Sequence, residues 1–171
     1  MIRTLLGKTP VLGKGVFVAE TAAVIGDVEI GDQSSIWYGA VIRGDVMPIR
    51  IGARTSVQDG AVVHVTAGRH GTTIGSDCTV GHGAIIHACV VEDMCLIGMG
   101  SIILDGARIG PGSLVGAGAL VTPGTDIPPG SLVIGSPAKV KRPINDRERE
   151  QIMFGAAHYV ELTARYLAEG G

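Results

Sequence analysis

The chain is poor in aromatic residues and in charge of either sign. Aromatic side chains make up 4% of its 171 residues, and the formal net charge at pH 7 is -2. The absence of a basic block argues against nucleic acid as a partner. No run of about 18 apolar residues could span a membrane, and no secretory signal pattern is present. We therefore expect a soluble, cytoplasmic protein without a membrane partner.

Glycine is abundant, with 27 residues, and a branched aliphatic residue recurs at every sixth position. The series runs from Leu12 to Ile42 and resumes at Ile51 after a three-residue insertion. It resumes at Ile74 after an insertion of five residues and, with one residue dropped on the way, continues to Val133. The fifth position of most units is Ala, Ser, Thr or Cys. Such a fixed period is the signature of a solenoid.

One aliphatic and one small inward residue per unit build a short strand and a corner. Three units would close a triangular coil, and coils would stack about 4.8 Å apart. The pattern resembles the left-handed parallel β-helix of hexapeptide-repeat proteins. The handedness comes from that resemblance, because parallel crossovers are otherwise right-handed. We expect an all-β solenoid, a left-handed parallel β-helix, over residues 1–140, with a C-terminal α-helix over 141–171 packed on it within a single domain.

The end of the chain has a helical pattern. Asn145 is a suitable N-cap, and apolar residues then recur at helical spacing, which predicts a helix over about 145–168 along one wall of the prism. The three cysteines fit the same compartment. Cys78 and Cys95 occupy the small inward position on adjacent coils, and Cys89 has no evident partner. Buried free thiols in a reducing cytosol are therefore expected.

Three histidines fall at outward positions of the repeat. His64 and His87 occupy the same position three units apart, so their backbones should be rung neighbours about 4.8 Å apart. Two imidazoles so placed can share one metal ion at about 2.0–2.1 Å. His82 stacks above Asp59 on another wall and would have to reach around a corner.

We therefore predict a cyclic homotrimer with metal sites at its interfaces, in which His64 and His87 come from one chain and His82 from its neighbour. The alternative is that these histidines make only surface or interface hydrogen bonds. His70, in the inserted loop, and His158, on the helix, fit neither column and are predicted to be non-ligands. Trp37, one rung below Gln58, is predicted to be a structural residue that could pack the subunit interface.

The ordered motifs of the chain resemble the gamma-class carbonic anhydrase family over about residues 10–168. The motifs are Arg43-Gly44-Asp45, Val57-Gln58-Asp59-Gly60, His64, Gly81-His82-Gly83 and His87. The resemblance implies that the three histidines bind Zn²⁺, or Fe²⁺ or Co²⁺, with water completing the site.

The resemblance also implies roles for residues around the metal. Gln58 would hydrogen-bond the metal-bound water and help to hold bicarbonate. Arg43 and Asp59 would form an intersubunit salt bridge, which Asp45 could join. Tyr159 matches a position near the site, and the alternative for it is a core contact between helix and prism.

The implied reaction is the reversible hydration of carbon dioxide by a metal-bound hydroxide. Zn²⁺ with three nitrogen ligands lowers the pKa of its bound water to about 7, which supplies that hydroxide. Val46 and Ala67 stand where family members with an acidic loop carry glutamate. Hydration is therefore expected to be slow, buffer-dependent or absent, unless His70 in the loop Ala67–Thr73, which contains the insertion, relays protons. Three alternatives remain. The protein could catalyse metal-dependent thioester hydrolysis, or acyl transfer on the same β-helix. It could also be a non-enzymatic assembly protein whose metal only stabilises the trimer.

Overall fold

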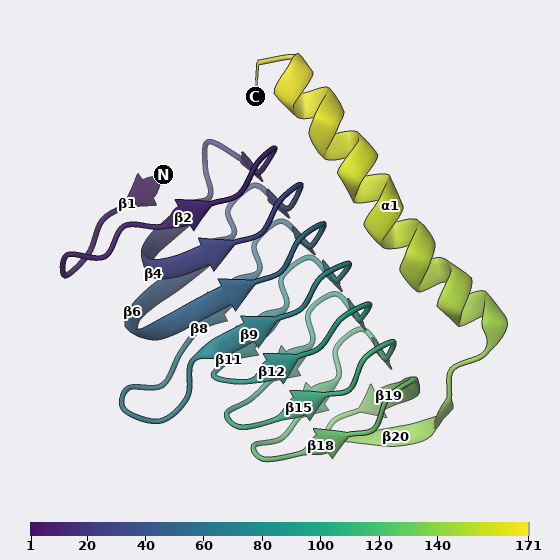
Figure 1. Cartoon of the computed structure of the whole chain (residues 1–171). Helices are drawn as coiled ribbons and strands as arrows, with labels where there is room; N and C mark the ends of the chain where they lie inside the picture. The colour runs from purple at the N-terminus through teal and green to yellow at the C-terminus, as the bar shows by residue number, and fades with distance from the viewer. Residues whose placement is uncertain (171) are drawn as a thin grey trace.

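The computed structural model describes residues 1–170, and Gly171, the last residue of the expected C-terminal segment, lies outside them. The described chain forms a left-handed parallel β-helix of about seven coils. A long C-terminal helix, α1 (Asp146–Ala168), runs along one side of the coils (Figure 1). The predicted fold class is therefore confirmed.

Strands fall into three walls, which correspond to the three sides of each coil. β4 and β6 are long enough to turn the corner between walls one and two, so those walls form one continuous 12-stranded sheet. All strand pairs are parallel except β19 with β20, which is antiparallel and closes the base of wall three. Walls one and two comprise β1 (Ile2–Arg3), β2 (Val11–Leu12), β4 (Ala23–Ile30), β6 (Val41–Ile51), β8 (Val62–His64), β9 (Thr72–Ile74), β11 (Ile85–His87), β12 (Val90–Val91), β14 (Ile102–Ile103), β15 (Arg108–Ile109), β17 (Leu120–Val121) and β18 (Asp126–Ile127). Wall three comprises β3 (Phe17–Val18), β5 (Ser35–Ile36), β7 (Ser56–Val57), β10 (Thr79–Val80), β13 (Leu96–Ile97), β16 (Leu114–Val115), β19 (Ser131–Gly135) and β20 (Ala138–Pro143).

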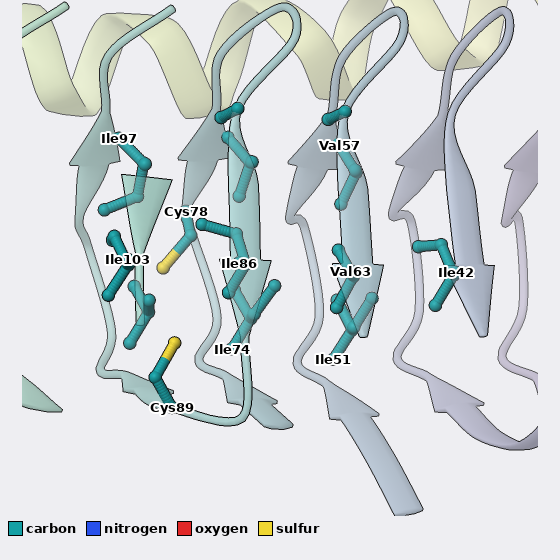
Figure 2. Close-up of a cluster of buried hydrophobic side chains, with 14 of the residues drawn as sticks. Ile42, Ile51, Val57, Val63, Ile74, Cys78, Ile86, Cys89, Ile97 and Ile103 are labelled. Carbon is teal, nitrogen blue, oxygen red and sulfur yellow. The ribbon is translucent and has the colours of Figure 1, made fainter. Parts of the chain in front are cut away.

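The aliphatic residues of the repeat fill the prism (Figure 2). On wall one, Ile42, Val63, Ile86 and Ile103 stack in register, each completely buried. Burial of one such side chain stabilises the fold by roughly 1.5–3 kcal/mol. Because the same position is buried in every coil, the register cannot slip by one residue without exposing the whole column.

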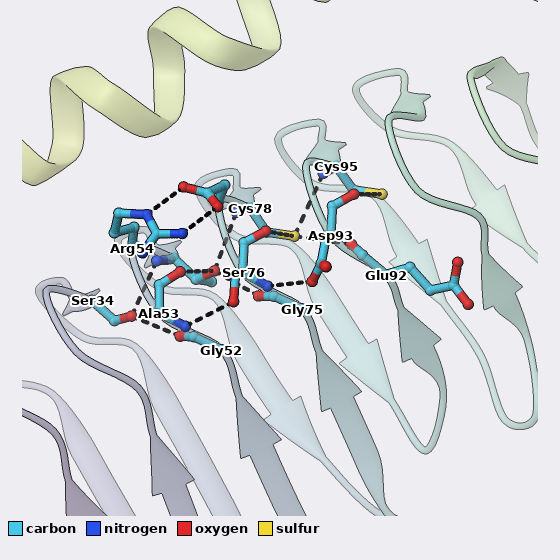
Figure 3. A network of polar contacts seen from close by, with 12 residues as sticks. Ser34, Gly52, Ala53, Arg54, Gly75, Ser76, Cys78, Glu92, Asp93 and Cys95 are labelled. Carbon is cyan, nitrogen blue, oxygen red and sulfur yellow. Dashed lines mark hydrogen bonds and ion pairs between the residues drawn. The ribbon is translucent and has the colours of Figure 1, made fainter.

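The small residues of the repeat satisfy the backbone where wall three begins (Figure 3). The Thr55 hydroxyl donates to the Gly75 carbonyl at 2.7 Å and accepts the Cys78 N–H at 3.1 Å. Ser34 accepts the Thr55 N–H in the same way, and the Cys78 sulfur accepts the Cys95 N–H at 3.5 Å. A polar or thiol side chain in this column therefore links successive coils inside a dry core. Cys78, Cys89 and Cys95 are all buried free thiols, as predicted.

Helix α1 begins where the sequence predicts. The Asn145 side chain accepts the Glu148 N–H at 2.9 Å, and the Glu148 carboxylate accepts the Asn145 N–H at 2.8 Å, which together form a capping box. The helix packs on β3, β5, β7 and β10 of wall three. Within residues 1–170, no helix combines the length and the apolar character that crossing a bilayer requires.

Trp37 is the centre of the contact between helix and wall. The centroid of its ring lies 5.6 Å from that of Tyr159, 5.1 Å from that of Tyr166 and 5.2 Å from that of Phe17. The residue is only 4% exposed. The expectation that Trp37 could pack a subunit interface is therefore wrong. The residue faces wall three, which the helix of the same chain already covers.

Candidate metal centre

His64 and His87 end the neighbouring strands β8 and β11 of wall one and pair directly in register. The Nδ1 atom of His64 lies 3.2 Å from the Nε2 atom of His87. The predicted stacking of these two histidines is confirmed. It follows from the parallel register, which carries one repeat position straight up the wall.

The other nitrogen of each ring contacts an aspartate. The Nε2 atom of His64 lies 3.0 Å from the Asp45 carboxylate, and the Nδ1 atom of His87 lies 2.7 Å from the Asp105 carboxylate. The Arg43 guanidinium contacts Asp45 from the other side. Asp105 also accepts a hydrogen bond from the Thr66 hydroxyl.

Both aspartates favour the ionised form. Desolvation works to raise the pKa of Asp45, but the hydrogen bond from His64, a backbone hydrogen bond and the charge of Arg43 lower it overall. The hydrogen bond from Thr66 is the main cause that lowers the pKa of Asp105, and the bond from His87 adds to it against desolvation. Ionised carboxylates only accept hydrogen bonds. Nε2 of His64 and Nδ1 of His87 are therefore the donors.

This arrangement leaves two ring nitrogens without protons when both imidazoles are neutral. They are the two atoms that face each other at 3.2 Å. Two nitrogen ligands of a tetrahedral zinc ion, bound at about 2.0–2.1 Å, lie roughly 3.3 Å apart. The observed separation fits two ligands of one such ion, so the His64–His87 pair can form half of a metal centre.

His82 lies elsewhere in the same chain, at the corner after β10 of wall three. Its Nδ1 atom lies 2.7 Å from the Asp59 carboxylate of the coil below, which confirms their predicted stacking. The imidazole is 47% exposed. Among residues 1–170, no three His, Cys, Asp or Glu side chains of one chain are arranged to hold a metal ion. The single chain thus brings together His64 and His87 but not His82.

Gln58 and Tyr159 lie near the His82 corner. The Gln58 side-chain oxygen accepts the His82 N–H at 3.2 Å, and the residue is 6% exposed. Tyr159 packs edge-on against Trp37, which agrees with a core contact. Desolvation, and secondarily the charge of Asp59, raise the pKa of Tyr159. Tyr159 is therefore both a core residue and a neighbour of the corner, and catalytic roles for both residues stay predictions.

Within one chain Arg43 pairs with Asp45, and Asp59 pairs with His82, so the intersubunit Arg43–Asp59 bridge stays a prediction. His70 lies in the inserted hairpin, and His158 stacks on Phe154 with ring centroids 5.7 Å apart. Neither joins the histidine pair.

Sequence reasoning missed Asp105 and Thr66. The backbone N–H of Gly106 donates to the Ala88 carbonyl at 2.7 Å, which sets Asp105 one coil above the residue after His87. An acidic residue at that repeat position was the available signal for Asp105. Thr66 precedes an insertion, where the repeat no longer predicts which way a side chain points.

Comparisons with known proteins identify the family to which the chain belongs. The repeat matches the family "Bacterial transferase hexapeptide (six repeats)" over residues 9–44 and 88–123. A carbonic anhydrase of Geobacillus kaustophilus is 46% identical over 98% of this chain and 92% of its own. Gamma carbonic anhydrase 2, a mitochondrial protein of Arabidopsis thaliana, is 45% identical over 98% of this chain, which spans 63% of that relative's length. The chain belongs to the gamma-class carbonic anhydrase family of hexapeptide-repeat proteins.

Solved structures agree with this fold. The crystal structure of a hexapeptide transferase family protein from Anaplasma phagocytophilum has a TM-score of 0.92 and 39% sequence identity. The match covers 97% of this chain and 98% of that one.

Proposed function

We propose that this protein is a gamma-carbonic-anhydrase-like metalloenzyme that catalyses the reversible hydration of carbon dioxide. The observation that carries the proposal is the His64–His87 pair, whose Nδ1 and Nε2 atoms face each other 3.2 Å apart while the other nitrogen of each ring contacts an aspartate. This separation is close to that of two nitrogen ligands on one tetrahedral metal ion. The relatives named carbonic anhydrase support the reaction.

The proposed metal centre is shared between copies of the chain. His64 and His87 of one copy and His82 of its neighbour would hold Zn²⁺, Fe²⁺ or Co²⁺. When bound, such an ion with three nitrogen ligands keeps an open position and lowers the pKa of bound water to about 7, which supplies a hydroxide nucleophile. Asp45, Asp105 and Asp59 each hold one of the three imidazoles in a fixed orientation.

An exposed apolar column supports the homotrimer. Val62, Ile85, Ile102 and Leu120 stack in register on the outer face of wall one, beside the histidine pair. Val62 and Ile85 remain 36% and 37% exposed in the single chain. Contiguous exposed apolar surface marks an interaction site. Three copies with this face toward a common axis would bury it and bring the His82 corner of one copy to the histidine pair of the next.

The chain's own residues would then position the reactants. Gln58 is fixed by its hydrogen bond to the His82 backbone. Its amide would hold the attacking water or the bicarbonate product. Val46 and Ala67 carry no carboxylate, and the carboxylates of Asp45 and Asp105 are already engaged by the two imidazoles, so the proton released in each turnover would pass to solvent buffer. Turnover should therefore increase with buffer concentration.

A second candidate is acyl transfer to, or hydrolysis of, a thioester. A structural neighbour is named as a transferase. In addition, a cleft of about 460 Å³ beside His82 is lined by Gln58, Leu96 and Leu114 among others, more space than carbon dioxide needs. A third candidate, a metal that only staples an assembly protein, predicts metal-dependent trimers with neither activity.

The test is stopped-flow carbon dioxide hydration by trimer with quantified metal, loaded with zinc or, without oxygen, with iron(II). We expect the wild-type protein to be active. The His82→Ala variant should lose both the activity and the stoichiometric binding of metal. His158→Ala, which changes a histidine outside the site, is the matched control and should retain both. No activity at full metal occupancy would contradict the proposal, and hydrolysis of acetyl-CoA by the same sample would favour the second candidate.

A cytoplasmic location is also part of the proposal. The three buried cysteines are free thiols, which is typical of proteins in a reducing compartment. Fractionation of cells that produce the protein would test the location.

A further inference from the structure

Asp105 lies behind His87 and uses both of its carboxylate oxygens. Oδ1 accepts the Nδ1–H of His87 at 2.7 Å, and Oδ2 accepts the hydroxyl of Thr66. The backbone beside it is fixed by the hydrogen bond from Gly106 to Ala88. The carboxylate is therefore held by two contacts, and one of its oxygens lies against the ring nitrogen of His87 that faces away from His64.

Thr66 reaches Asp105 from the position just before the insertion that follows His64. A backbone hydrogen bond of 3.2 Å from Thr66 to His70 closes this insertion into a short hairpin. Thr66 thus links the coil of His64 to the coil of Asp105, 39 residues away along the chain. The insertion adds a polar contact that the regular repeat would lack.

We propose that Asp105 is a positioning residue for the metal ligand His87, and that Thr66 locks Asp105 in place. This inference rests on the metal site of the proposed function. The charge of Asp105 keeps the proton of His87 on Nδ1, so Nε2 presents its lone pair beside His64. Partners of this kind fix the tautomer and ring orientation of ligating histidines, and their loss weakens metal binding by roughly 10- to 100-fold.

Metal affinity, measured by competition with a chromophoric chelator for Zn²⁺ or Co²⁺, tests the positioning role. We expect Asp105→Ala to bind metal roughly 10- to 100-fold more weakly than wild type. Thr66→Val, which removes the hydroxyl, should also weaken metal binding, but by less. Thr66→Ser, which keeps a hydroxyl, should bind metal as tightly as wild type. Asp126→Ala is the matched control, because Asp126 is an exposed aspartate on wall two that pairs with Arg108. The absorption spectrum of bound Co²⁺ should change in Asp105→Ala and not in the control.

A second readout is independent of metal. Long-range ¹H–¹⁵N correlation spectra of the metal-free protein report which nitrogen of His87 carries the proton. We expect the proton on Nδ1 in wild type and a mixture of the two tautomers in Asp105→Ala.

The outcomes separate this inference from the proposed function. Wild type that binds no metal overturns the metal site itself. Wild type that binds metal, with folded Asp105→Ala and Thr66→Val variants of unchanged affinity and tautomer, overturns the positioning role alone. If Asp105→Ala does not fold, the comparison of Thr66→Val with Thr66→Ser decides, because both leave the carboxylate in place.

Discussion

The Nδ1 atom of His64 faces the Nε2 atom of His87 across 3.2 Å, while each ring gives its other nitrogen to a separate aspartate. The two aspartates come from different coils and approach the pair from opposite sides. Neutral imidazoles held in this way present two lone pairs to one point, which is the geometry of a metal half-site. The other half must come from elsewhere, since His82 lies at a different corner of the prism.

A shared site predicts complementation between two inactive variants. His64→Ala and His82→Ala should each fail to bind stoichiometric metal alone. In trimers assembled from an equal mixture, each interface has a one-in-two chance of an intact His64–His87 pair and a one-in-two chance of an intact His82. About a quarter of the interfaces would therefore be complete, and about a quarter of the metal should return. Metal content after refolding of the mixture measures this.

The control for that experiment is a mixture of His64→Ala with His87→Ala. Both changes damage the same half-site, so no interface of these trimers can be complete and no metal should return. Return of a quarter or more of the metal in the control, or none in the first mixture, would contradict a site built from two copies.

The apolar column on wall one predicts the oligomeric state. Ile85→Asp places a charge in the middle of this column, and threefold symmetry would bring three such charges together near the axis. We expect monomers in sedimentation equilibrium, at the 17.5 kDa chain mass, where wild type gives three times that mass. The metal should be lost with the trimer.

Thr73→Asp is the matched control, because Thr73 is an exposed strand residue on wall two. It should leave both the mass and the metal content unchanged. A trimeric Ile85→Asp protein would place the interface on another face of the prism.

The cap of helix α1 predicts a specific loss of stability in acid. Glu148 accepts hydrogen bonds from Arg142 and from the Asn145 backbone, which lower its pKa from 4.5 to about 2. The folded state therefore favours the ionised form. This contribution is complete above pH 4.5 and disappears as the pH falls towards 2.

Glu148→Gln should accordingly lower the thermal unfolding midpoint at pH 7 and reduce the further decrease between pH 5 and pH 2.5, both relative to wild type. Glu150→Gln, an exposed change on the same turn of α1, should behave like wild type in both respects. Equal acid sensitivity of Glu148→Gln and wild type would show that this carboxylate does not contribute to the capping of the helix.

Counting repeat units was sufficient to predict the prism, the burial of the aliphatic column, the free cysteines and the stacking of His64 on His87. The reason is that parallel strands in register preserve the repeat position from coil to coil, so spacing in sequence becomes height on a wall. The N-cap at Asn145 was equally local, because it depends on residues within one helical turn.

Only the tertiary structure decided the contacts that cross from one kind of segment to another. The packing of Trp37 under α1 depends on which wall the helix covers, and the repeat pattern is the same on all three walls. The bond from Thr66 to Asp105 depends on the path of an inserted loop outside the repeat. The sequence by itself thus determined which residues share a column, because the period of the repeat is local. The fold decided which side chains surround the histidine pair, because those contacts join loops and coils that are far apart in the chain.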